Sequence, residues 1–78
     1  MKIEKILGTD AEKNILFVNS EGTYYMINAS KYVFGTWYSE LSDDAYFAKA
    51  APYYETAIVW PNGQGISPED VDEFAIPV

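Results

Sequence analysis

The sequence contains no cysteine, no histidine and no arginine. Without cysteine the chain can form no disulfide and has no thiol nucleophile, which fits a reducing compartment. Without histidine it lacks the usual general base of an enzyme. Without arginine, and with only five lysines, it lacks the basic surface that binds nucleic-acid phosphates or an anionic membrane. We therefore expect a protein that is not an enzyme, uses no cofactor and does not bind nucleic acid directly.

Long hydrophobic runs are also missing. No apolar segment approaches the length that crosses a bilayer, and the first residues lack the hydrophobic stretch of a signal peptide. With 78 residues, the chain fits one small domain over residues 1–78. These features predict a cytoplasmic protein.

Negative charge is abundant and unevenly distributed. The net charge is −7, and residues 1–31 contribute nothing to it, with four acidic residues and four lysines. Residues 32–78 hold eight acidic residues and only Lys49, so they carry all of the net charge. This acidic half can attract a basic partner surface, or it can simply keep an aromatic-rich domain in solution.

The aromatic content is high, at 17% of the chain, and supplies large side chains for a core. Alternating or continuous apolar residues predict strands over residues 2–7, 14–18, 23–28 and 57–60. The second of these is apolar enough to be buried on both faces, and residues 19–22 predict a hairpin turn.

Helices are predicted near 43–50, with Ser42 as N-cap, and over 68–74, with Ser67 as N-cap and Val71, Phe74 and Ala75 as its apolar stripe. Residues 53–55 either pair with the strand at 57–60 or lead into it. The predicted fold is α+β, a small, mainly antiparallel sheet of four or five strands covered by two short helices.

Residues 57–68 combine a strand, an abrupt turn and a helix start. After the apolar run 57–60, Pro61 cannot donate to a sheet ladder. Asn62 and Gly63 then form a strong turn signal, because both tolerate positive φ. Pro68 suits the first turn of a helix. Trp60, Pro61, Asn62, Gly63 and Pro68 are thus assigned a structural role.

Residues 29–40 are rich in aromatic side chains without a clear period, so we expect an irregular loop with at most one helical turn near 30–33. Tyr32, Trp37 and Tyr38 either pack into the core or form a partner-binding patch.

Four acidic residues, Glu69, Asp70, Asp72 and Glu73, crowd the last helix. Their oxygens can hold Mg²⁺ or Ca²⁺, but the spacing lacks a ligand loop, so a solvated helix face is favoured and no metal is expected. Gly63, Gln64 and Gly65 precede this helix, yet they lack the lysine and the glycine spacing of a phosphate-binding loop.

The run from Ala57 to Gly63, followed by Ser67, Pro68 and Glu69, resembles a widespread bacterial family, the domain of unknown function 2442, which has a Trp-Pro-Asn-Gly box. The hairpin from Leu16 to Gly22, and Leu41-Ser42-Asp43 with Phe47, also match it. Two positions differ, since Gly65 and Asn28 stand where the family commonly has Asp. The resemblance implies a compact α+β domain without an established activity. Some members of the family look like stand-alone antitoxins, and others precede a DNA-binding domain.

Two functions follow as hypotheses. The first is a non-enzymatic protein-binding module, antitoxin-like or accessory, that regulates or neutralises a partner protein. The second is an acidic anti-defence inhibitor that mimics nucleic acid and blocks a basic groove. The partner-binding residues expected are Tyr32, Trp37 and Tyr38 for the first, and Glu69, Asp72 and Glu73 for the second.

Overall fold

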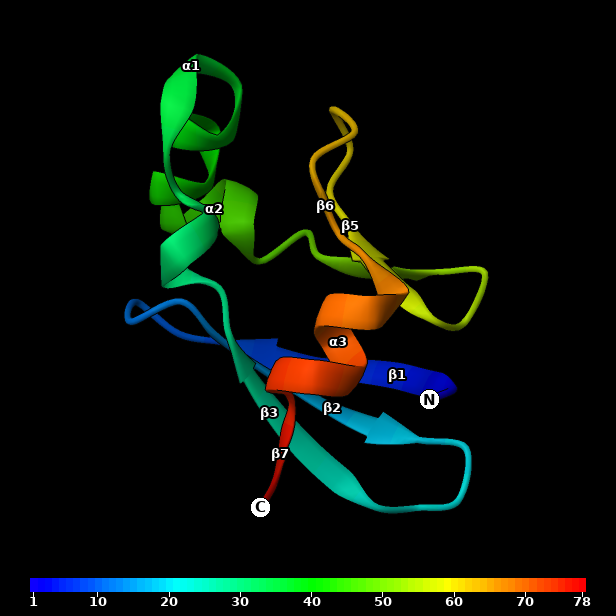
Figure 1. Ribbon diagram of the computed structural model, residues 1–78. Helices are drawn as coiled ribbons and strands as arrows, with labels where there is room; N and C mark the ends of the chain where they lie inside the picture. The colour runs from blue at the N-terminus through cyan, green and yellow to red at the C-terminus, as the bar shows by residue number, and fades with distance from the viewer.

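The computed structural model describes residues 1–78 and has an α+β architecture with two antiparallel sheets. Figure 1 shows the larger sheet of β1, β2, β3 and β7 below the smaller sheet of β4, β5 and β6, with α3 between them in this view. The strands are β1 Ile3–Thr9, β2 Asn14–Asn19, β3 Tyr24–Asn28, β4 Ala51–Tyr53, β5 Ala57–Val59, β6 Gly65–Ile66 and β7 Ile76–Pro77. The helices are η1 Ser30–Tyr32, α1 Gly35–Tyr38, η2 Ser39–Ser42, α2 Asp44–Phe47 and α3 Pro68–Phe74, where η denotes a 3₁₀-helix.

The predicted α+β class is confirmed, but the predicted single sheet covered by two helices is too simple. The chain has a four-stranded sheet, a separate three-stranded sheet and three short α-helices. The two-residue strands β6 and β7 account for part of the difference, because strands this short show no alternation in the sequence. None of the helices is long and apolar enough to cross a membrane.

The hairpin of β2 and β3 forms as predicted. The Asn19 side-chain oxygen accepts hydrogen bonds from the backbone N–H groups of Glu21 (3.0 Å) and Thr23 (2.8 Å). Gly22 has a φ of +83°, a conformation that glycine adopts at little steric cost. The turn residues therefore fix the register of β2 and β3.

β2 is buried on one face only, which corrects the prediction that both faces are buried. Ile15 and Phe17 are fully buried on the inner face, whereas Leu16 between them is 36% exposed. The reason is that the helices and the smaller sheet cover one side of the four-stranded sheet, so alternate side chains face outward.

The smaller sheet settles how residues 53–55 connect to the next strand. β4 pairs antiparallel with β5, so Tyr53 lies opposite Ala57. Of the three residues between them, Tyr54 and Glu55 both have positive φ, 49° and 68°. Turn positions with positive φ normally hold Asn or Gly, so this hairpin holds bulkier residues in a conformation that they adopt rarely.

The helices agree with the sequence in part. α3 spans the predicted residues, and the Ser67 hydroxyl caps it by accepting from the Asp70 N–H (3.2 Å). α2 is shorter than predicted, and its N-cap is Asp43 instead of Ser42, since the Asp43 carboxylate accepts from the Ala45 N–H. In the predicted loop, η1 supplies the expected helical turn, while α1 and η2 are additional.

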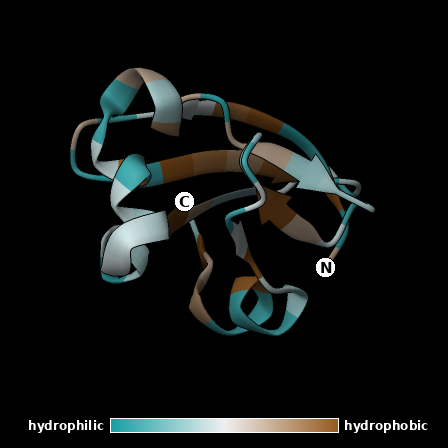
Figure 2. Ribbon diagram, turned by 90° about the horizontal axis from the view of Figure 1, so that it is seen from above, coloured by the Kyte–Doolittle hydropathy of each residue, from teal (hydrophilic) through white to brown (hydrophobic).

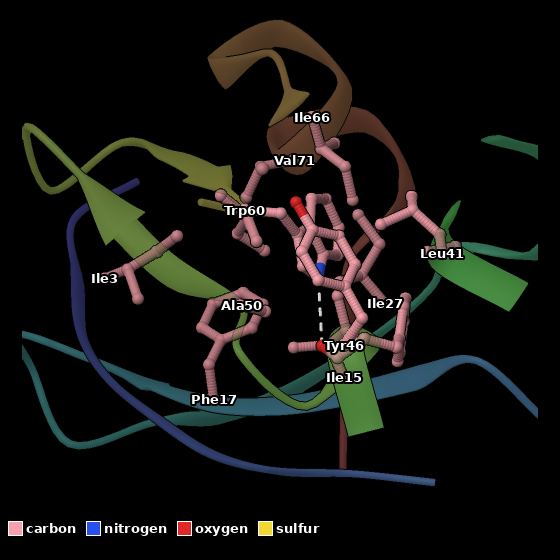
Figure 3. Packing of buried hydrophobic residues seen from close by; sticks show 13 residues of the cluster. Ile3, Ile15, Phe17, Ile27, Leu41, Tyr46, Ala50, Trp60, Ile66 and Val71 are labelled. Carbon is pink, nitrogen blue, oxygen red and sulfur yellow. Dashed lines mark hydrogen bonds between the residues drawn. The ribbon is translucent and has the colours of Figure 1, made fainter. Parts of the chain in front are cut away.

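One hydrophobic cluster of 13 buried residues joins both sheets and α3. In Figure 3 the Trp60 indole lies at its centre and donates from Nε1 to the Phe47 carbonyl oxygen (2.9 Å). Figure 2 shows how hydropathy varies along the chain, with hydrophobic strand segments and hydrophilic loops. On α3, Val71 is buried in this cluster and Ala75 packs against it, but Phe74 is 39% exposed, so the apolar stripe is narrower than predicted.

Candidate functional site

The Trp-Pro-Asn-Gly box forms the tight connection between β5 and β6. The Trp60 N–H donates to the Gln64 carbonyl oxygen, and the Gly63 N–H donates to the Trp60 carbonyl oxygen, both at 2.9 Å. Gly63 has a φ of +95°, which requires glycine in practice. Trp60 is 2% exposed and anchors the turn in the core.

A buried glutamine ties this turn to the preceding helices. The side chain of Gln64 is fully buried. Its Nε2 donates to the Glu40 carboxylate (2.9 Å) and to the Trp37 carbonyl oxygen (3.1 Å), while its Oε1 accepts from the Tyr46 hydroxyl (2.7 Å). Every buried side-chain nitrogen and oxygen in the protein has a partner. The network therefore holds α1, η2 and α2 against the box with no unpaired polar atom.

Glu40 is the member of this hydrogen-bond network that lies at the surface. Its carboxylate accepts two hydrogen bonds from the Asn62 side chain (2.8 and 2.9 Å) as well as the bond from Gln64. The bonds from Asn62 and then Gln64 lower the pKa of Glu40 below its ordinary value. Glu40 is thus an exposed, ionised carboxylate in a fixed position.

Phe34 and Trp37, at the start of α1 and within it, are called the aromatic patch here, and Trp37 lies next to the box. Phe34 is 73% exposed and Trp37 is 56% exposed, although both are large apolar side chains. A Cβ atom placed on Gly63 would come within 3.2 Å of the Trp37 ring, so the ring lies directly against the turn. The Tyr38 ring packs edge-on against Trp37, with 5.7 Å between ring centroids. The turn and the network beneath it thereby restrict the indole while leaving it accessible.

The structure separates the three aromatic residues that the sequence grouped together. The Tyr38 hydroxyl donates to the Gly65 carbonyl oxygen (2.9 Å), and the Tyr32 hydroxyl donates to the Asp70 carboxylate. Burial and the Asp70 carboxylate raise the pKa of Tyr32, so its hydroxyl stays protonated. Tyr32 and Tyr38 are half-buried structural residues, and Trp37 alone presents its ring to solvent.

The three acidic residues expected to bind a partner are exposed on α3. Glu69 and Glu73 make no hydrogen bond or ion pair within the chain, whereas Asp72 accepts from the N-terminal ammonium (3.0 Å). Figure 1 shows α3, the helix of these acids, near the middle of the molecule and α1, the helix of Trp37, at one end. No group of three acidic side chains is arranged to hold a metal ion.

Sequence reasoning missed Phe34, Glu40 and Gln64. Phe34 was seen only as part of an aromatic loop, and Glu40 and Gln64 carry no local signal. Their side-chain partners lie 18 to 27 residues away along the chain, so only the folded structure brings them together.

No family model matches the chain, and no curated protein or solved structure matches it. The resemblance to the family with the Trp-Pro-Asn-Gly box stays a prediction from the residues quoted above.

Proposed function

We propose that this chain is a non-enzymatic protein-binding module that regulates or neutralises a partner protein, in the manner of an antitoxin or an accessory protein. The aromatic patch is its docking surface. The proposal rests on one observation: Phe34 and Trp37 are exposed at α1, and a buried hydrogen-bond network ties α1 to the box. Exposed and restrained aromatic residues are typical anchors of protein interfaces, because they bury much apolar area while losing little conformational entropy.

Glu40 adds to the chemistry expected of the partner. The carboxylate is ionised and fixed through Asn62, which follows Pro61 in the box. A partner that fits this surface therefore presents an apolar pocket for Trp37 and a basic group toward Glu40.

A capture experiment compares the native chain with two single variants in extracts of the source cell, read by quantitative mass spectrometry. Trp37→Ala should lose the specific partner. Tyr54→Ala, which removes an even more exposed aromatic side chain (82%) outside the patch, should retain it. Equal capture by both variants contradicts the assignment of the docking surface.

The nucleic-acid mimic stays the second candidate, because Glu69 and Glu73 are exposed and unpaired on α3. Binding through this acidic surface should weaken steeply with salt and should compete with DNA or RNA. Binding through the aromatic patch should depend weakly on salt. Affinity at two salt concentrations therefore separates the two functions.

A further inference from the structure

The four-stranded sheet has an apolar outer face that no other part of the chain covers. Directly opposed residues of antiparallel strands share a face, and three such pairs lie here: Val18 with Tyr24, Leu16 with Met26, and Met26 with Ile76. The Val78 N–H donates to the Tyr24 carbonyl oxygen, so Val78 continues the row. We call this set the outer sheet patch: Leu16, Val18, Tyr24, Met26, Ile76 and Val78. Figure 1 shows the helices and the smaller sheet on the opposite side.

The patch is hollowed at one end. A depression of about 410 Å³ is lined by Gly8, Thr9, Asp10, Asn14, Leu16, Met26 and Val78. Gly8 lies opposite Leu16 and lacks a side chain, and a Cβ atom built there would meet nothing within 4 Å. Tyr24 protrudes at the other end of the patch, beside the β2–β3 turn, and is 54% exposed.

Charge is sparse on this face of a chain whose net charge is −7. The paired positions hold one charged residue, Lys5, which lies opposite Val18 and makes no ion pair within the chain. The nearest side-chain carboxylates are at the rim, Glu4 in the bulge of β1 and Asp10 in the β1–β2 turn. Two copies of so acidic a chain repel each other, and a face with few acidic side chains lets them approach with less repulsion.

The exposed area is large enough for a small interface between two copies. The exposed fractions of Leu16, Tyr24, Ile76 and Val78 lie between 36% and 74%. With the half-buried Val18 and Met26, the patch amounts to on the order of 500 Å² of apolar surface, so two copies bury about 1,000 Å², the lower limit for a specific interface.

We propose that the outer sheet patch binds a second copy of this chain, giving a symmetric dimer in which the two four-stranded sheets pack face to face. The row of Leu16 and Met26 lies midway between the Lys5 end and the Asp10 end of the face. A two-fold axis through this row, perpendicular to the strands, places the same residues of both copies together. The same axis brings Lys5 of each copy toward Asp10 of the other, and Val18 and Tyr24 toward the other copy's hollow. This dimer does not depend on the aromatic patch or on the proposed function.

Sedimentation equilibrium from about 1 µM to about 500 µM tests the dimer, because this range covers the weak association of an interface at the lower size limit. Leu16→Glu places a carboxylate at the centre of the interface, so it should weaken self-association by at least about 100-fold. Leu16 is already part-exposed, and a native circular dichroism spectrum checks that the variant folds. Tyr54→Glu adds the same charge at an exposed aromatic position outside the patch and should leave the dissociation constant unchanged.

Lys5→Glu tests the orientation, because it turns two attractions to Asp10 into repulsions and should weaken the dimer by about tenfold. A native chain that stays monomeric across the whole range overturns the proposal. So does a dimer that Leu16→Glu and Tyr54→Glu affect equally. An unchanged constant for Lys5→Glu overturns the proposed axis.

Discussion

The Gln64→Met substitution measures how much stability the buried network beneath the box contributes. Methionine has nearly the size of glutamine but removes the hydrogen bonds to Glu40, Trp37 and Tyr46. Each bond contributes about 1 kcal/mol net, and the Tyr46 hydroxyl hydrogen is left unpaired at a cost of roughly 1–3 kcal/mol, whereas the Trp37 carbonyl oxygen still accepts from the Ser39 N–H. Because burying methionine offsets part of this loss, we expect a destabilisation of about 3 kcal/mol.

A loss of this size is large for a chain of 78 residues, whose total stability is roughly 4–12 kcal/mol. Urea unfolding followed by tryptophan fluorescence is the assay. If the unfolding free energy falls by about 1 kcal/mol per M of urea, the urea concentration at the unfolding midpoint should fall by roughly 2–3 M. The dependence of the free energy on urea should stay unchanged.

Tyr46→Phe is the matched control, because it removes only the hydroxyl that Gln64 and the Asn62 N–H share. It should destabilise by roughly 2 kcal/mol, and the double variant should lose at least about 1 kcal/mol less than the sum of the two. A Gln64→Met variant within about 0.5 kcal/mol of the native chain refutes the reasoning, and so does strict additivity.

Three further predictions concern single positions. The pKa of Glu40 is lowered in the folded state, so the stabilisation from its ionised carboxylate is fully present above the ordinary pKa of 4.5 and is lost as the pH falls through the lowered value. Glu40→Gln should therefore make the unfolding midpoint fall less between neutral and acidic pH than it does for the native chain. Gly63→Ala, at a φ of +95° and 3.2 Å from the Trp37 ring, should destabilise by about 1–2 kcal/mol and shift the tryptophan emission. Glu55→Gly relieves a positive φ of 68° and should raise the unfolding free energy by about 0.5–1 kcal/mol in the same urea assay, whereas a lower value would show that the turn is unstrained.

The sequence predicted the strands and turns whose signals are local. β2, β3 and the turn after Asn19 follow from an apolar run, a tyrosine-rich run and a glycine that needs positive φ. α3 follows from Ser67 and Pro68 at its start. Each of these signals lies within a few residues of the element that it specifies, so no tertiary information is required.

The rest depends on contacts distant in sequence. Leu16 is apolar, so the sequence predicts that the outer face of β2 is buried. Only the arrangement of the sheets and helices in the folded chain shows that nothing covers this face. Gln64 stands between two glycines and looks like a loop residue, yet it is fully buried by partners in η2 and α2. Trp37 and Tyr38 are adjacent and both aromatic, but the hydrogen bonds of the Tyr38 hydroxyl to Gly65 leave only Trp37 accessible.

The affinity of the captured partner for variants of the two candidate surfaces tests the proposed docking surface most directly. The variants are Trp37→Ala and a combined Glu69→Gln, Asp72→Asn and Glu73→Gln chain, each measured at low and high salt. Trp37→Ala should weaken binding by at least about 30-fold, which corresponds to roughly 2 kcal/mol for an interface anchor. The charge-neutralised chain should bind nearly as well as the native one. If the charge-neutralised chain loses binding and Trp37→Ala keeps it, the aromatic patch is not the docking surface and the nucleic-acid mimic is the better account.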